Sequence, residues 1–363
     1  MRRRAFGAAT IATVIFVATI ATAPASEARS RVQSPSLTGE IERVLDSYRA
    51  KGISDGVVLV ARKGVPVFRK AFGLANREWG IPNTPYVEFG IDSMTKQFTA
   101  MAILQLAADG KLSLDDPISK FVQAAPPAWQ GITIRHLLTH TSGIPDHNSL
   151  PDWVKQTWVY RNPEDLIGFL RDRPLDFPAG SKFQYDNAGY VILGFIVQKA
   201  TGQSLGDYLK AQVFVPLGMK HTGYVGEEVL PHRASGYERD GTRWLADLWM
   251  TPIRDSGAGG IYSTADDLLT WDQALYEPKR LGLSDLRPMF TDYGHGYGFG
   301  YVIDKQDGHP LWWHNGHGGG FSSILARYPE DKLTIIVLCN DEGAPIGLLS
   351  HALADIYLKL LPR

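Results

Sequence analysis

The sequence predicts an α/β fold of the α+β type, with an antiparallel sheet flanked by helices and an inserted helical lobe. Two observations predict it. Strand-like segments gather near both ends of the 363-residue chain, and helix-like segments fill its middle. Runs of strands kept apart from runs of helices are typical of α+β folds. We therefore expect one domain over residues 36–363, with a sheet lobe from 36–110 and 255–363 and a helical lobe from 111–254.

The N-terminal part of this domain predicts a helix, a hairpin and a second helix. A helical pattern runs from Leu37 to Ala50, and the segment DGVVLVARKGVPVFRKAFG predicts two strands that turn at Lys63-Gly64. Between residues 94 and 112, apolar residues recur at helical spacing and predict a long buried helix. Ser93 then lies at the N-terminus of that helix.

The middle and the C-terminal part follow the same division. Helical patterns lie near 133–139, 163–171, 188–201 and 204–211, and the segment STADDLLTWDQALY predicts a helix capped by Ser263 or Thr264. Four strands are then predicted, in GYGFGYVID, HPLWWHNG, FSSILARYP and KLTIIVLCN, before a helix over 345–360. Cys339, the only cysteine, lies in the last strand, so it is expected to be a buried thiol without a disulfide.

The first 28 residues have the pattern of an export signal. Three arginines precede an apolar run from Ala5 to Ala23, and small residues at 21, 23 and 25 fit an A-x-A cleavage site. Cleavage near residues 23–28 would give a secreted or periplasmic protein. An uncleaved anchor remains open as an alternative, because the run approaches the roughly 20 residues that a spanning helix needs.

Charge excludes several kinds of partner. The formal net charge is −1 and the isoelectric point is about 6.8. No global field attracts nucleic acid or an anionic membrane surface. We expect a small-molecule or peptide-like substrate, with no nucleic acid and no membrane contact beyond a possible anchor.

Three short motifs carry the candidate chemistry. Ser93 and Lys96, three apart on one helix, share a face, and a buried lysine beside a serine can act as its base. The alternative is a serine near a helix start followed by a solvated lysine.

Tyr185 and Asn187 form the second motif. They offer a phenol that shuttles a proton and an amide that holds a lysine or a carbonyl group. The alternative is that Asp186 or Asn187 only caps a helix.

The third motif lies in WWHNGHGGGFSS. His314 can orient a substrate carboxylate or assist proton transfer, and glycines such as Gly316 let a substrate backbone approach the strand. A zinc site built from His314, His317 and His295 is disfavoured because no HExxH motif or partnered carboxylate accompanies them. We expect no metal and no other cofactor.

The order of these three motifs resembles that of the three catalytic motifs of the serine β-lactamase and penicillin-binding protein superfamily. Segments around the motifs, such as ITIRHLLTHTSGIPD and GAGGIYSTADDLLTW, are similar to its class C type, β-lactamase-related family. The resemblance spans about residues 40–340. It implies that Ser93 is the acylated nucleophile, that Lys96 helps to deprotonate it and that Tyr185 moves protons. Asn187 would position the substrate and Lys96. The implied oxyanion donors are the Ser93 N–H and an N–H near Gly320, Phe321 or Ser322.

One departure from class C β-lactamases bears on the substrate. Those enzymes carry Lys-Thr-Gly where this chain has His314-Asn315-Gly316, a pattern that resembles DD-peptidases and D-aminopeptidases. The leading interpretation is an exported serine hydrolase of peptide-like amides, of the DD-peptidase, D-aminopeptidase or β-lactamase kind. A carboxylesterase is the first alternative. A penicillin-binding receptor or scaffold with little turnover is the second.

Overall fold

The computed structural model describes residues 36–123, 125–154, 162–226, 229–247 and 257–359, all within one compact unit, Ser36–Arg363. The expected signal segment, residues 1–28, lies outside the described residues. In the part of the chain that is described, no helix combines the length and the apolar character that crossing a membrane requires.

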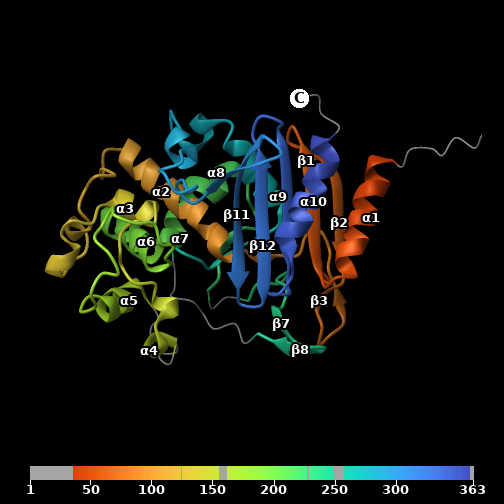
Figure 1. Ribbon diagram of the computed structural model, residues 1–363, viewed down its shortest axis with the longest axis horizontal. Coiled ribbons are helices and arrows are strands. Elements are labelled where there is room, and N and C mark those ends of the chain that lie inside the picture. Colours follow the sequence, from red (N-terminus) through yellow and green to blue (C-terminus); the bar gives the residue numbers. More distant parts are fainter. Residues whose placement is uncertain (1–35, 124, 155–161, 227–228, 248–256, 360–363) are drawn as a thin grey trace, which may run out of the picture. The chain divides into compact units, whose positions relative to one another are not determined.

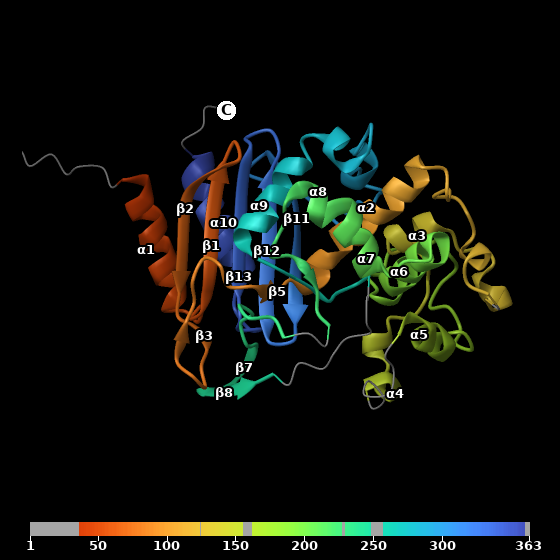
Figure 2. The same ribbon diagram turned by 180° about the vertical axis from the view of Figure 1, so that it is seen from behind.

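A six-stranded antiparallel sheet forms the centre of this unit (Figures 1 and 2). Its order is β10-β11-β12-β13-β1-β2, so that strands from both ends of the chain meet between β13 and β1. This confirms the predicted α+β fold. The strands are β1 (Gly56–Arg62), β2 (Val65–Phe72), β10 (Val302–Gln306), β11 (His309–Gly318), β12 (Phe321–Tyr328) and β13 (Leu333–Cys339).

The hairpin β1–β2 turns at Lys63-Gly64, as predicted. Both residues have positive φ, 52° and 76°, which suits the two-residue turns that follow the twist of a hairpin. Strand β1 is buried on both faces, because Val57 and Leu59 belong to one apolar cluster and Val58 and Val60 to the other. A run of consecutive apolar residues therefore marks this central strand, where a half-exposed strand would alternate.

Helices cover both faces of the sheet. Helices α1 and α10 pack together on one face, in the cluster that also buries Cys339. Helix α9 packs on β1 and β13 from the other face, where the larger cluster joins the sheet to the helices of the middle segment. The helices are α1 (Leu37–Arg49), α2 (Thr95–Ala108), α3 (Ile134–Leu138), α4 (Pro151–Val154), α5 (Pro163–Leu170), α6 (Ala188–Thr201), α7 (Leu205–Leu209), α8 (Val215–Leu217), α9 (Ala265–Ala274) and α10 (Ile346–Leu358).

Helix α2 carries the candidate nucleophile region and lies in the middle of the larger cluster. Every residue from Thr95 to Leu106 is buried, including polar ones, and α2 packs against α6. A helix buried on all sides is held by its neighbours along its whole length. Side chains at its N-terminal end are therefore fixed in position.

Two features differ from the predicted elements. The strand expected in GYGFGYVID begins only at Val302, because the glycines before it pack a loop against α2: a Cβ on Gly300 would lie 2.7 Å from the backbone oxygen of Lys96. Short strands also form small sheets that no pattern predicted. They are β3 (Leu74–Asn76), β4 (Ile81–Pro82), β5 (Phe89–Gly90), β6 (Gly223–Tyr224), β7 (Tyr237–Asp240), β8 (Arg243–Ala246) and β9 (Ile261–Ser263).

Candidate active site

Ser93 lies where a 3₁₀ turn, Asp92–Met94, runs into α2. The chain arrives from β5, and the N–H of Ile91 donates to the backbone oxygen of Ile261 at 2.9 Å. Asp92 then adopts a positive φ of 43°, a conformation that is rare for residues other than glycine and common at functional sites. The turn leaves Ser93 partly exposed at the N-terminal end of α2, where the helix dipole favours negative charge.

Lys96 is fully buried, and oxygen atoms surround its Nζ. Nζ lies 3.1 Å from Oγ of Ser93, 2.8 Å from Oδ1 of Asn187 and 3.0 Å from the backbone oxygen of Ala258. An ammonium group has three N–H donors for these three acceptors. An amine that has lost one proton still serves the two other acceptors and turns its lone pair toward the Ser93 hydroxyl. The alternative of a solvated surface lysine is therefore wrong.

The Tyr-x-Asn motif divides its two possible roles between neighbouring residues. Asp186 caps α6, since its carboxylate accepts a hydrogen bond from the N–H of Gly189. Asn187 occupies the N-cap position but makes no side-chain capping bond, and its amide oxygen instead accepts from Lys96. The capping interpretation holds for Asp186, and Asn187 is left to hold the lysine.

Asp146 fixes the orientation of the Asn187 amide. Its Oδ1 accepts from the backbone N–H of Asn187 at 3.2 Å, and Nδ2 of Asn187 lies 3.4 Å from each carboxylate oxygen. Because the amide nitrogen faces a carboxylate, the amide oxygen faces Lys96. Nothing in the sequence singles out Asp146, although it ends the segment ITIRHLLTHTSGIPD.

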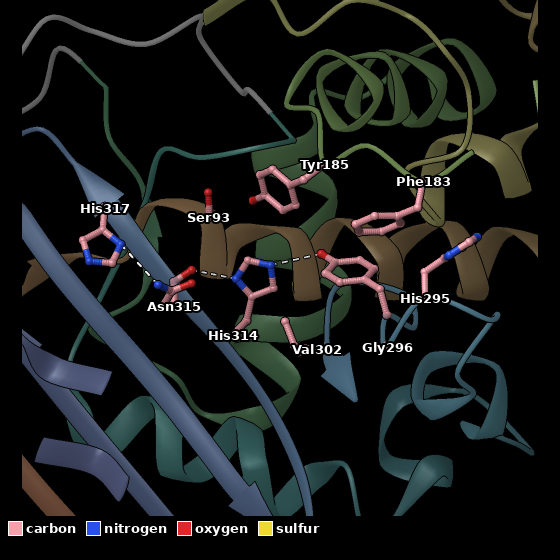
Figure 3. A pocket seen from close by; sticks show the side chains of 10 residues that line it. Ser93, Phe183, Tyr185, His295, Gly296, Val302, His314, Asn315 and His317 are labelled. Atoms are coloured by element: carbon pink, nitrogen blue, oxygen red, sulfur yellow. Dashed lines mark hydrogen bonds between the residues drawn. The ribbon is translucent and has the colours of Figure 1, made fainter. Parts of the chain in front are cut away.

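Tyr185 stands beside the serine and the lysine. Its ring lies 4.8 Å from Nζ of Lys96 and packs on the ring of His140 at 4.4 Å. Figure 3 shows its hydroxyl directed toward Ser93. Its residue surface is 36% exposed, so the phenol reaches the solvent and any bound substrate.

His314 is buried on β11, and both ring nitrogens are engaged (Figure 3). Nδ1 lies 2.6 Å from the backbone oxygen of Asn315, and Nε2 lies 3.0 Å from the hydroxyl of Tyr297. A ring that donates from Nδ1 and accepts at Nε2 is neutral. Burial, reinforced by the coulombic effect of Lys96, lowers the pKa of His314 from 6.5 to about 3. A neutral ring with both nitrogens engaged offers no positive charge to a substrate carboxylate, and the predicted role of His314 in orienting one stays a prediction that the next experiment tests.

We expect His314 to leave no trace in the pH profile of the enzyme. Because its pKa is lowered, the ring stays neutral from about pH 5.5 to about pH 9, where an ordinary histidine would lose its charge. The quantity measured is the ratio of kcat/KM for a cephalosporin, which carries a carboxylate, to kcat/KM for p-nitrophenyl acetate. This ratio should vary with pH in the same way in wild type and in His314→Gln.

His314→Lys provides the matched comparison. A lysine at position 314 places a cation in the cavity that also contains Ser93. Cephalosporin acylation near pH 8 should therefore rise by about tenfold. The rate with p-nitrophenyl acetate should change little. A wild-type ratio that falls as pH rises through about 6.5, and that His314→Gln removes, would contradict the neutral ring.

Gly316 has a structural role, and its predicted contact with substrate stays a prediction. A Cβ at this position would lie 2.1 Å from the backbone oxygen of Ile91. Glycine therefore lets β11 pack directly against the segment that leads into Ser93. The backbone that approaches this glycine belongs to the protein itself.

The predicted second oxyanion donor also needs correction. The N–H of Gly320 already donates to Oε2 of Glu342 at 2.9 Å. Phe321 and Ser322 are fully buried in β12, a strand with neighbours on both sides. None of these three residues lines the cavity that contains Ser93.

The edge of β11 supplies a different N–H. Pairing with β10 ends at Trp313, and a two-residue turn, Gly319-Gly320, with φ of 56° and 79° joins β11 to β12. The residues that flank such a turn exchange both backbone hydrogen bonds, and bonded pairs alternate along the hairpin. The backbone groups of Asn315 and His317 consequently point away from β12, and both residues line the cavity with Ser93.

The cavity measures about 450 Å³ and runs from Ser93 past Tyr185 and His314 to an aromatic end (Figure 3). Phe183 and His295 line that end. Among the described lining residues there is no lysine or arginine. This end of the cavity therefore suits an uncharged, apolar group.

The sequence profile of the family described as Beta-lactamase matches residues 41–356, a range that contains the whole site. The chain belongs to the Beta-lactamase family. Members of this family are serine hydrolases, and so is this chain.

Relatives within the Beta-lactamase family differ in their names. Penicillin-binding protein 4* of Bacillus subtilis (strain 168) is 30% identical over 329 residues, which cover 83% of this chain and 71% of the relative. Esterase EstB of Burkholderia gladioli is 31% identical over 318 residues, 75% of this chain and 80% of the esterase. The crystal structure of a penicillin-binding protein from Bacillus halodurans superimposes with a TM-score of 0.77 at 31% identity, covering 88% of this chain and all of that one.

Proposed function

We propose that this protein is an exported serine hydrolase that forms an acyl-enzyme on Ser93, and that its substrates are peptide-like amides. The proposal rests on one contact above all: Nζ of the buried Lys96 lies 3.1 Å from Oγ of Ser93. A serine hydroxyl is a weak nucleophile until a neighbouring base takes its proton. Asn187 and Ala258 hold Nζ at that distance.

The acylation step uses four groups of the chain. Oγ of Ser93 attacks the substrate carbonyl carbon while its proton passes to Lys96, with Tyr185 as the second group able to take it. The oxygen of the tetrahedral intermediate becomes negative. We assign its stabilisation to the backbone N–H groups of Ser93 and His317, the second of which lies on the free edge of β11.

Departure of the leaving group completes the acyl-enzyme. The carbon–nitrogen bond breaks, and the amine needs a proton as it leaves. Tyr185 is the donor we propose, because its hydroxyl points toward Ser93 from the side of the aromatic cavity. Water then attacks the ester on Ser93, and the same groups return their protons.

A carboxylesterase is the second candidate function. An ester oxygen leaves with less need of a proton than an amine does, so the same residues suffice. The aromatic end of the cavity has no lysine or arginine among its described lining residues, and EstB, a relative of similar identity, is named an esterase. A penicillin-binding receptor with little turnover is a third candidate; it would use Lys96 to acylate Ser93 but would not hydrolyse the acyl-enzyme.

A parallel substrate panel tests the proposal. The purified protein should react with a fluorophosphonate probe and should hydrolyse D-amino-acid p-nitroanilides faster than it hydrolyses a chromogenic cephalosporin, because the cavity lacks a cation for the cephalosporin carboxylate. Activity should survive EDTA. Turnover of p-nitrophenyl esters without any turnover of anilides would favour the esterase. Probe labelling without turnover of any substrate would favour the receptor.

A further inference from the structure

His140 packs against Tyr185, although the proposed mechanism gives it no role. It follows α3, in the segment ITIRHLLTHTSGIPD, and its side chain is fully buried. Its backbone has a positive φ of 56°, a conformation that costs free energy in residues other than glycine, asparagine and aspartate. Such a conformation persists only where the surrounding contacts require it, and it often occurs at functional sites.

His140 holds the chain on both sides of Tyr185. Its backbone oxygen accepts a hydrogen bond from the N–H of Gln184 at 2.9 Å, and its Nδ1 accepts one from the N–H of Asp186 at 3.2 Å. The residues immediately before and after Tyr185 are thus bonded to one and the same residue. These two bonds fix the backbone from which the phenol projects toward Ser93 (Figure 3).

The imidazole ring of His140 also supports the side chain of Tyr185. The two ring centroids lie 4.4 Å apart, closer than the centroids of Tyr297 at 6.3 Å and His314 at 6.2 Å. The imidazole is held in turn by the rings of Tyr190 at 5.1 Å and Tyr297 at 4.7 Å. A close-packed ring of this kind has no room to tilt away, so it fixes the plane on which the phenol lies.

These contacts need a flat ring that also carries a hydrogen-bond acceptor. Because the N–H of Asp186 points at Nδ1, that nitrogen carries no proton, and the ring is neutral with its proton on Nε2. Burial lowers the pKa of His140, which agrees with the neutral form. A phenylalanine in this place would keep a ring but leave the N–H of Asp186 without its acceptor, which would loosen the segment.

We propose that His140 is the positioning residue for Tyr185, and that it is needed for the hydrolysis of amides far more than for that of activated esters. An amine must receive a proton as the carbon–nitrogen bond breaks, whereas p-nitrophenolate leaves as an anion. Proton transfer requires the phenol within hydrogen-bond reach of the leaving nitrogen, so a small shift of Tyr185 affects amides first. This inference rests on the proposed role of Tyr185 as proton donor and deepens it.

Two substrates that form the same acyl-enzyme test the proposal, D-alanyl p-nitroanilide and D-alanyl p-nitrophenyl ester. The quantity measured is the ratio of kcat/KM for the anilide to kcat/KM for the ester, after spontaneous hydrolysis is subtracted. Tyr185→Phe should lower this ratio by about 100-fold or more, the size of a general-acid contribution. His140→Phe, which misplaces the phenol without removing it, should lower the ratio by about tenfold or more.

The double variant His140→Phe/Tyr185→Phe decides whether His140 acts through Tyr185. Its ratio should equal that of Tyr185→Phe within about twofold, because no hydroxyl is left to position. A merely structural role would instead lower the ratio further or lower both rates alike, and either result would overturn the proposal. The control is His351→Asn, at an exposed position of α10, which should keep the wild-type ratio.

His140→Asn keeps the test decisive if His140→Phe fails to fold. Asparagine suits a positive φ and offers an acceptor but no ring, so this variant should fold, as judged by circular dichroism, and should still lower the ratio severalfold. A wild-type ratio in a folded His140 variant, with a lowered ratio in Tyr185→Phe, would overturn this inference alone. A wild-type ratio in Tyr185→Phe, or a wild type that hydrolyses only the ester, would overturn the proposed amide mechanism as well.

Discussion

Ser93→Ala should abolish labelling by a fluorophosphonate probe and should lower kcat/KM by about 10⁴-fold or more. The substitution removes the only hydroxyl that the structure holds within 3.1 Å of Lys96 Nζ among the described residues. Ser93 is partly exposed, so the loss of its Oγ leaves no large buried cavity and the fold should survive. Intact-mass spectrometry with peptide mapping measures the result.

Ser47→Ala is the control, because Ser47 is exposed on α1, a helix of the opposite face of the sheet. It should label as wild type does. Wild-type label should map to the peptide that contains Ser93 and add one probe per chain. Full-strength labelling of Ser93→Ala would show that another residue reacts, and the acyl-enzyme mechanism on Ser93 would be abandoned.

The parts of the fold and site that sequence predicts are those set by local spacing. Ser93 and Lys96 lie three residues apart on a helix, so their contact follows from helix geometry. The two-residue turn at Lys63-Gly64 is equally local. The contact between Lys96 and Asn187, 91 residues apart, is beyond local spacing, and only the resemblance to a family indicated it.

The errors lie where pairing register and burial decide. Three consecutive glycines, 318–320, left the position of the β11–β12 turn open in the sequence, and a shift of one residue reverses which backbone groups face the free edge. The predicted donor accordingly fell on residues 320–322, whereas the donor that we propose from the strand pairing is His317. The neutral state of His314 depends on Tyr297 and on burial, neither of which a histidine in a strand pattern reveals.

Lys96→Arg should lose nearly all acylation of Ser93, by about 10³-fold or more, although it keeps a positive charge. A guanidinium does not give up its proton in a protein, so it cannot accept the proton of Ser93. It also has a planar fork where Ser93, Asn187 and Ala258 surround a single nitrogen. The rate of labelling by the fluorophosphonate probe measures acylation directly.

Because arginine is larger than lysine in a fully buried position, a second variant must separate lost chemistry from lost packing. Lys96→Cys removes the amine, and alkylation of that cysteine with 2-bromoethylamine restores an amine at nearly the same length. The shortened side chain at position 96 leaves a gap that opens toward the partly exposed Ser93, whereas Cys339, the only native cysteine, is buried between the sheet and its helices. Wild type treated with the same reagent should therefore gain no mass. Recovery of labelling after alkylation, with Lys120→Arg on the exposed surface behaving as wild type, would establish that the amine at position 96 activates Ser93. Labelling of Lys96→Arg within a few fold of wild type would assign the base to Tyr185 instead.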